Sequence, residues 1–235
     1  MEQNKIRLLC TRTVSRSLVR QARSAGLSMD VVSFIETEPI QSIEVQQEIQ
    51  QVLTQIATVV FTSTNAVEAV AAELDGQQPD WQIFCTANAT KELVKKYFGD
   101  NSIGGTAEDA AGLAEVIMDR IAEKNEVIFF CGDQRRAELP EKLAEKGIDI
   151  IEIVVYQTIP IPHRVNGIYE GIIFFSPTAV KSFFQVNKTS GKTIFFAIGD
   201  TTAAEIKKYS ANRIIVASEP GKERLVETAI DFFHV

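Results

Sequence analysis

Eight short runs of small polar residues supply the groups that could do chemistry in this chain. Each run follows an apolar segment and precedes a helical pattern, as in "VVFTSTNAV" from Val59 to Val67. Ser, Thr and Asn at such positions commonly cap the next helix, and for any single run capping is the simpler interpretation. Helix N-termini also present free N–H groups and a partial positive charge, which bind carboxylates or phosphates without a lysine. The runs are 11–12, 62–65, 86–90, 104–106, 132–136, 176–178, 199–202 and 218–222.

Residue types that usually carry metal or nucleophilic chemistry are sparse. Cys10, Cys85 and Cys131 are isolated, fit no zinc spacing, and are expected to be small buried hydrophobic residues. His163 and His234 have no neighbours that would make them metal ligands or members of a catalytic triad. The chain contains neither a P-loop nor a GxGxxG motif, so nucleotide binding has little support. The expected ligand of the polar runs is therefore a large polyanionic small molecule.

The predicted strands and helices that position these runs indicate an α/β fold. Short β-branched or aromatic segments alternate with helical patterns such as Arg16–Ala25; they include Ile6–Cys10, Asp30–Ile35, Thr58–Phe61 and Asn101–Ile103. Several strand candidates are apolar throughout, which is typical of parallel strands covered on both faces. The alternation predicts parallel sheets with the polar runs beyond the carboxyl ends of the strands.

Two long stretches of the chain recur. "FTSTNAV" from Phe61 matches "FFSPTAV" from Phe174, a shift of 113 residues (174 − 61). "IRLLC" from Ile6 matches "VIFFC" from Val127, a shift of 121 residues (127 − 6). Stretches that repeat in order imply duplication of one folding unit. We therefore expect two similar α/β domains.

The domain boundaries depend on two proline-bearing stretches, "ETEPIQ" and "QTIPIP", which interrupt the pattern and suggest linkers. A tandem division near residue 123 is the alternative, and periodicity alone does not choose between the two. If the proline stretches are hinges, the linkers run side by side. The division is then 1–36 plus 162–235 for domain one, 42–156 for domain two, and 37–41 and 157–161 for the linkers.

The composition of the chain argues against several classes of protein and partner. The chain of 235 residues carries a net charge of −7, which does not favour binding to nucleic acid or to an anionic membrane. The N-terminus "MEQNKIRLLCTR" lacks the apolar core of a signal peptide. No apolar run approaches the roughly 20 residues of a membrane span. A cytoplasmic protein without nucleic-acid or membrane partners is expected.

Taken in series, the motifs resemble the uroporphyrinogen-III synthase family. The similar pieces are "FTSTNAVEAV", "NATKEL", "CGDQRRAELPEKLAEKGIDI" followed by "VVYQT", "FFSPTAVKSF" and "FAIGDTTAAEIKK". They occur in the family's order and spacing and cover nearly the whole chain. The resemblance implies two flavodoxin-like domains with parallel sheets, a two-strand linker joining them and a cleft between them. It favours the interleaved domain boundaries over the tandem ones.

The resemblance also implies a reaction. The family's substrate is hydroxymethylbilane, a linear tetrapyrrole with eight carboxylates, which it cyclises to uroporphyrinogen III in porphyrin and heme biosynthesis. Water is lost to give an azafulvene, and the last pyrrole ring is inverted through a spiro intermediate. Such a lyase needs no metal or redox cofactor, because it works by positioning with one weak acid to help the hydroxyl leave. A monomer is expected.

Site residues follow from the same motifs. Tyr156 in "VVYQT" matches the tyrosine that the family links to the leaving hydroxyl, although a lone tyrosine there could instead anchor a hinge by packing. Arg135 and Arg136 are secondary candidates as counter-charges, because a basic pair in a first helical turn is often only solvated. The expected substrate-binding residues are Arg12, Thr62, Ser63, Asn88, Ser176, Lys181, Thr201 and Thr202.

Two other classes of protein remain as alternatives. One is a two-lobed small-molecule binding protein without catalysis. The other is a signalling protein built from duplicated receiver-like domains, which would need a cluster of acidic residues at the strand ends. Asp133 and Asp200 each stand alone there, which counts against a receiver.

Overall fold

The chain divides into two compact units. The computed structural model describes residues 6–122, 125–218 and 221–234. Unit 1 is Met1–Glu36 with Ile159–Val235, and unit 2 is Thr37–Thr158. Unit 1 is therefore discontinuous, with unit 2 inserted into it. The chain passes between the units at 36/37 and at 158/159, next to the two prolines Pro39 and Pro160.

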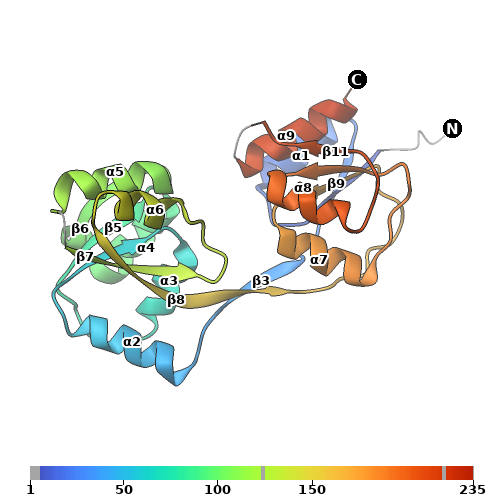
Figure 1. Ribbon diagram of the computed structural model, residues 1–235. Coiled ribbons are helices and arrows are strands. Elements are labelled where there is room, and N and C mark those ends of the chain that lie inside the picture. The colour runs from blue at the N-terminus through green and yellow to red at the C-terminus, as the bar shows by residue number, and fades with distance from the viewer. Residues whose placement is uncertain (1–5, 123–124, 219–220, 235) are drawn as a thin grey trace. The chain divides into compact units, whose positions relative to one another are not determined.

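Unit 1 is a five-stranded parallel sheet covered by helices on both faces (Figure 1). The spatial order β2-β1-β9-β10-β11 becomes 2-1-3-4-5 when numbered along this unit, which is the flavodoxin-like order. Leu8 and Cys10 of β1 face α1 and α9, whereas Leu9 faces α7 and α8. The strands are β1 (Arg7–Cys10), β2 (Ser28–Val31), β9 (Gly171–Phe174), β10 (Ile194–Ala197) and β11 (Ile214–Val216). The helices are α1 (Arg16–Ser24), α7 (Pro177–Val186), α8 (Asp200–Lys207) and α9 (Lys222–Phe233).

Unit 2 repeats this arrangement and adds one strand. Its sheet has the order β8-β7-β4-β5-β6, with β3 beyond β8. Val59 and Phe61 of β4 face α2, α3 and α4, whereas Val60 faces α5 and α6. The strands are β3 (Ile35–Pro39), β4 (Ala57–Phe61), β5 (Trp81–Thr86), β6 (Ile103–Ala107), β7 (Glu126–Gly132) and β8 (Asp149–Pro160). The helices are α2 (Ile43–Leu53), α3 (Thr64–Ala71), α4 (Ala89–Phe98), a 3-10 turn (Asp100–Ser102), α5 (Ala110–Arg120) and α6 (Glu138–Glu145).

The two sheets confirm the prediction of two similar α/β domains. The repeated segments occupy equivalent strands: β9 corresponds to β4, β10 to β5, and β1 to β7. Along the chain, however, unit 2 begins at the strand that is third in unit 1. Its order along the chain is 5-4-1-2-3, so unit 2 is a circular permutation of unit 1.

The two chain crossings lie side by side. β3 is the neighbour of β8 at the edge of the sheet of unit 2. The Ile161 N–H donates to the Phe34 carbonyl at 2.9 Å, and the Ile40 N–H donates to the Val155 carbonyl at 2.9 Å. Phe34 pairs with Ile161 and Ile40 pairs with Val155, so the two segments run in opposite directions and are antiparallel. Pro39 and Pro160 end their strands, a place where a missing N–H is tolerated.

Two strand predictions differ from the structure. The segment Asp30–Ile35, predicted as one strand, is divided between the end of β2 and the start of β3. The strand predicted at Asn101–Ile103 is displaced to Ile103–Ala107, so the run 104–106 lies within β6 rather than beyond it. Its glycines allow close packing, because a Cβ on Gly105 would lie 2.7 Å from Cγ1 of Val116. In the run 218–222, residues 219 and 220 lie outside the described residues.

The three cysteines are buried and free, as predicted. Burial raises the pKa of each thiol to about 11, so all three are protonated and unreactive at neutral pH.

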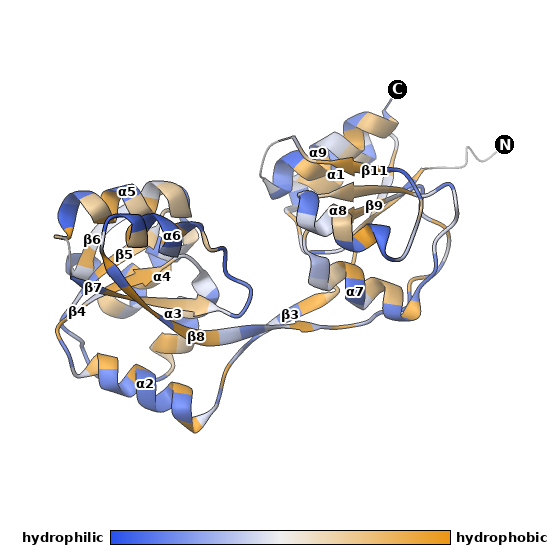
Figure 2. Ribbon diagram, viewed as in Figure 1, coloured by the Kyte–Doolittle hydropathy of each residue, from blue (hydrophilic) through white to orange (hydrophobic). Residues whose placement is uncertain are grey.

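The hydropathy of the residues fits helices that pack on apolar strands with one face and expose the other face to water. Figure 2 shows hydrophobic and hydrophilic residues interspersed along the helices, as expected when only one face is covered. Within the described parts of the chain, no helix combines the length and the apolar character that a membrane crossing requires.

Candidate functional site

Each sheet has one position where the strand order reverses. It lies between β1 and β9 in unit 1, and between β4 and β7 in unit 2. In open α/β sheets, ligands bind beyond the carboxyl ends of the strands at this switch point. Residues predicted for the site follow these strands directly: Arg12 follows β1, Ser176 follows β9, and Thr62 and Ser63 follow β4.

In unit 1 the switch point is held by Thr11. Its N–H and its hydroxyl both donate to the Ile173 carbonyl, at 3.1 and 2.7 Å, and its side chain is fully buried. Thr11 therefore ties β1 to β9 and places half-buried Arg12 at the edge. Ser176 caps α7, because its hydroxyl accepts the Ala179 N–H at 3.2 Å.

In unit 2 the matching serine has the same structural role. The Ser63 hydroxyl accepts the Asn65 N–H at 3.2 Å and caps α3. Thr62 lies just before it and is half-buried. Capping is thus observed for both predicted serines. Each hydroxyl satisfies one of the backbone donors at its helix N-terminus.

Tyr156 lies on β8 directly against Gly132 of β7. A Cβ added to Gly132 would lie 2.7 Å from the Tyr156 hydroxyl oxygen, so glycine is needed for the ring to lie there. The Asp133 N–H donates to the Tyr156 carbonyl at 3.1 Å, and the Asp133 carboxylate accepts the Thr158 N–H at 2.9 Å. The ring packs on the core of unit 2 while the side chain stays half-buried. No described residue hydrogen-bonds its hydroxyl, which leaves the phenol able to donate to a ligand.

The two threonines predicted at the start of α8 point in different directions. Gly199 precedes the helix and provides no side-chain cap, and Thr201 is exposed. Thr202 is only 1% exposed, and its hydroxyl is buried without a hydrogen-bond partner among the described residues. The Thr202 hydroxyl therefore does not face the edge, and only its backbone N–H could serve a ligand there. Asp200 at the first helical position is exposed.

Asn88 and Lys181 lie on exposed surface. Asn88 has φ of 62° and its side-chain amide donates to the Glu108 carboxylate at 3.2 Å. That partner is acidic, so it opposes an anion at this position. Lys181 is on α7 and exposed. Of the secondary candidates, Arg135 forms an ion pair with Glu152.

One charged residue at this edge was not predicted. Lys222 is the first residue of α9, just after Gly221. Lys222 is exposed by surface area, yet the protein around it lowers the pKa of its ammonium group, and the charge of Arg12 lowers that pKa further. The available sequence signal was the polar run 218–222, which ends in this lysine.

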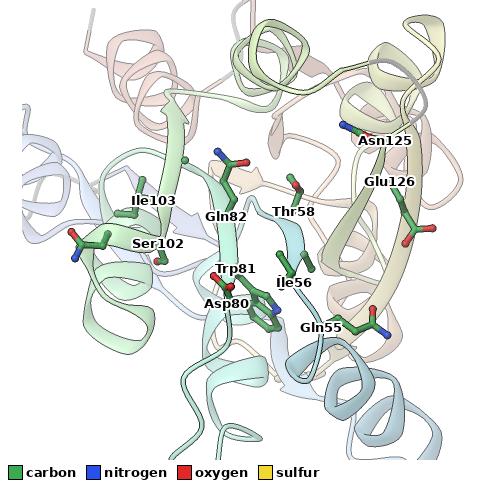
Figure 3. Close-up of a pocket in the computed structure, with 13 residues that line it drawn as sticks. Gln55, Ile56, Thr58, Asp80, Trp81, Gln82, Ser102, Ile103, Asn125 and Glu126 are labelled. Atoms are coloured by element: carbon green, nitrogen blue, oxygen red, sulfur yellow. The ribbon is translucent and has the colours of Figure 1, made fainter.

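A hollow lies at the opposite edge of unit 2. It has a volume of about 540 Å³ and lies at the amino ends of β4, β5, β6 and β7 (Figure 3). Among the described residues that line it, the charged ones are Asp80 and Glu126. An acidic hollow repels a polyanion, so the site is not placed there. Among the described residues, no group of His, Cys, Asp and Glu could hold a metal ion.

Comparisons with known proteins agree on one family. The family model of uroporphyrinogen-III synthase HemD matches residues 16–227. Uroporphyrinogen-III synthases of Chlorobaculum parvum and Saccharomyces cerevisiae are each 26% identical, covering 81% and 77% of this chain and 83% and 78% of those proteins. The crystal structure of uroporphyrinogen-III synthetase from Helicobacter pylori is similar in fold, with a TM-score of 0.62, 18% identity and coverage of 97% of this chain and 99% of that chain. A mutant synthase from Thermus thermophilus gives a TM-score of 0.57 at 12% identity, with 97% of each chain covered.

Proposed function

Because the chain belongs to the uroporphyrinogen-III synthase family, we propose that it cyclises hydroxymethylbilane to uroporphyrinogen III. The observation that carries the proposal is the family match over residues 16–227, which includes all the predicted site residues except Arg12. The geometry supports it, because both switch points present hydroxyls and helix N-termini suited to a polycarboxylate. The cleft expected between the domains stays a prediction.

In the proposed reaction, the C–O bond of the hydroxymethyl group breaks first. The pyrrole nitrogen supplies the electron pair, and the hydroxyl takes a proton from Tyr156, so that it leaves as water and an azafulvene cation remains. The Tyr156 hydroxyl, which has no partner among the described residues, first donates a hydrogen bond to this oxygen, and the tyrosinate takes a proton back when the final pyrrole is restored. The ring of Tyr156 against Gly132 and the backbone bonds of Asp133 fix the direction of that donor.

The second half of the proposed reaction is decided by position. The substituted carbon of the last pyrrole attacks the azafulvene and forms a new C–C bond in a spiro intermediate. That intermediate fragments and recloses with the ring inverted, and loss of a proton restores the pyrrole. Holding the carboxylates at the strand ends brings the substituted carbon within reach, which is catalysis by orientation. Thr62, Ser63, Ser176, Thr201 and the Thr202 N–H are the groups proposed to hold them.

An isomer-resolved assay tests the proposal. Purified protein is given fresh hydroxymethylbilane, and the products are oxidised and separated into type I and type III isomers. The type III isomer should predominate with protein, whereas the type I isomer should predominate without it. A type I fraction equal to that of the protein-free control would overturn the proposal. Tetrapyrrole binding by calorimetry without turnover would then favour the binding-protein alternative.

We also propose that the protein acts as a monomer in the cytoplasm. The net charge of −7 and the absence of a membrane-spanning helix among the described helices are consistent with this. Light scattering after size-exclusion chromatography should give a mass near 26.0 kDa. A mass of twice that value would contradict the monomer.

A further inference from the structure

Two cations lie together at the carboxyl edge of unit 1. Arg12 follows Cys10 by two positions, and Lys222 precedes Leu225 by three. Cys10 and Leu225 belong to the same buried cluster, and α1 and α9 pack together on that face of the sheet. Arg12 follows the carboxyl end of β1 and Lys222 begins the helix that follows β11, so both residues lie at the carboxyl edge of the sheet. The lowered pKa of Lys222, caused first by desolvation and next by the Arg12 charge, agrees with this closeness.

Neither cation forms an ion pair with a described residue. Three other cations of unit 1 do: Arg7 pairs with Asp30, Lys208 with Glu205 and Arg224 with Glu227. In the described parts of the chain, no carboxylate forms an ion pair with Arg12 or Lys222. The charge of Glu223 raises the pKa of Lys222, but the two side chains do not form an ion pair. Two unpaired like charges raise the energy of the free protein, and a bound anion would remove that cost.

We propose that Arg12 and Lys222 together form an anion subsite that binds one carboxylate of the tetrapyrrole substrate. The subsite lies at the carboxyl edge of unit 1, where Arg12 follows β1 and Lys222 begins α9. Guanidinium and ammonium groups can share one carboxylate, with the guanidinium donating two parallel hydrogen bonds and the ammonium a third. The identity of the ligand rests on the proposed function, whereas the anion subsite itself rests on the two unpaired cations.

Paired kinetics with a matched control provide the first test. Lys222→Gln should raise KM for hydroxymethylbilane roughly tenfold and leave kcat within about twofold, because a charge-assisted contact is lost without touching the reacting atoms. Lys207→Gln removes the same charge from an exposed position at the other end of α8 and should leave both constants within about twofold. Lys222→Arg should restore KM to within about threefold of the wild type. Equal KM values for Lys222→Gln and Lys207→Gln would overturn the proposal.

A binding measurement keeps the subsite testable without turnover. Lysine side-chain NMR of ¹³C-labelled protein follows the pKa of Lys222 with and without mellitate, a benzene ring bearing six carboxylates. The pKa of Lys222 should rise when mellitate binds, because an anion favours the charged ammonium. Arg12→Gln should also raise that pKa, by removing the neighbouring positive charge, and should abolish most of the response to mellitate. No response at a saturating concentration of mellitate would contradict the subsite.

The two proposals can fail separately. A Lys222 response to mellitate without type III isomer formation would support the anion subsite and refute the proposed function. Type III isomer formation with a KM that is unchanged by Lys222→Gln would support the function and refute the subsite. Arg12→Gln with Lys222→Gln should weaken substrate binding by less than the product of the single effects, because both cations hold the same carboxylate.

Discussion

Unit 1 and unit 2 share a strand order but present different groups at equivalent positions of their carboxyl edges. The repeat shift of 121 residues pairs Arg12 with Asp133 (12 + 121) and Ile35 with Tyr156 (35 + 121). A shift of 112 residues pairs Lys222 with Ala110 (222 − 112). Arg12 and Lys222 therefore have no equivalent cations in unit 2, and Tyr156 has no equivalent tyrosine in unit 1. In the proposed mechanism, charge recognition by these two cations belongs to one copy of the duplicated fold and help for the leaving group belongs to the other.

Asp133 occupies the position of unit 2 that corresponds to Arg12 in unit 1. Its carboxylate accepts the Thr158 N–H at 2.9 Å and its N–H donates to the Tyr156 carbonyl at 3.1 Å. An acidic group at this position would repel a substrate carboxylate, but here it fixes the strand that carries Tyr156. By contrast, the capping serines Ser63 and Ser176 are equivalent under the shift of 113 residues, and both have kept their role.

The largest effect is expected from Tyr156, which has no equivalent tyrosine in unit 1. Tyr156→Phe should lower kcat roughly 100-fold, because it removes the donor to the leaving hydroxyl while keeping the ring that packs on Gly132. The thermal midpoint should be unchanged. Tyr209→Phe, a control at a residue that is 46% exposed in unit 1, should keep full activity. A Tyr156→Phe rate within about threefold of the wild type would make Tyr156 a packing residue and remove the asymmetry between the units.

A smaller effect on rate is expected from Gly132, which corresponds to Thr11 in unit 1 (11 + 121). Gly132→Ala places a methyl group 2.7 Å from the Tyr156 hydroxyl oxygen and must displace the ring. It should cost about 1–3 kcal/mol of unfolding free energy and lower kcat roughly tenfold. Gly191→Ala is the control, because its Cβ would meet nothing within 4 Å. Both quantities come from urea unfolding and initial rates. Wild-type values for Gly132→Ala would show that the Tyr156 ring does not depend on this contact.

The smallest effect is expected on the stability at high pH. It concerns the edge of each sheet where the strands begin, and the two units differ there as well. Unit 1 has Tyr169 donating to Asp30 at 2.8 Å and Arg7 pairing with the same carboxylate at 2.7 Å. Unit 2 has isoleucines at the equivalent positions, Ile56 and Ile151. Burial, and then the bond to Asp30, raises the pKa of Tyr169 to about 12.

The raised pKa of Tyr169 predicts the sign of a pH effect. Because the folded-state pKa lies above the unfolded value of about 10, the stability from the neutral phenol is complete below pH 10 and is lost as the pH rises toward 12. The wild type should therefore lose more stability than Tyr169→Phe between about pH 9 and 11.5 in urea unfolding. Parallel losses in the two proteins would remove this difference between the units.

The sequence predicts the local helices and strands of the two repeated units better than it predicts which strands pair with one another. "VVFTSTNAV" correctly predicts a buried strand, a serine cap and a helix, because apolar runs and capping residues act locally. The circular permutation of unit 2 depends on which strands pair across long distances, and no local pattern contains that. Gly104 and Gly105 were predicted to lie beyond the end of a strand, yet they lie in β6, where close packing against Gln82 and Val116 requires glycine.

The candidate site also has features that local sequence patterns do not predict. The adjacent Thr201 and Thr202 are chemically identical, but helix phase points one outward and buries the other. The sequence likewise gave no reason to link Arg12 to Lys222, since 210 positions (222 − 12) separate them and only the packing of α1 on α9 brings them to one edge.

The isomer ratio at increasing protein concentration tests the central claim most directly. Hydroxymethylbilane closes spontaneously to the type I isomer, so each concentration of protein sets a competition between free and bound substrate. The type III fraction should rise with protein concentration toward complete conversion. A type I to type III ratio that stays at the protein-free value over the whole range would contradict the account.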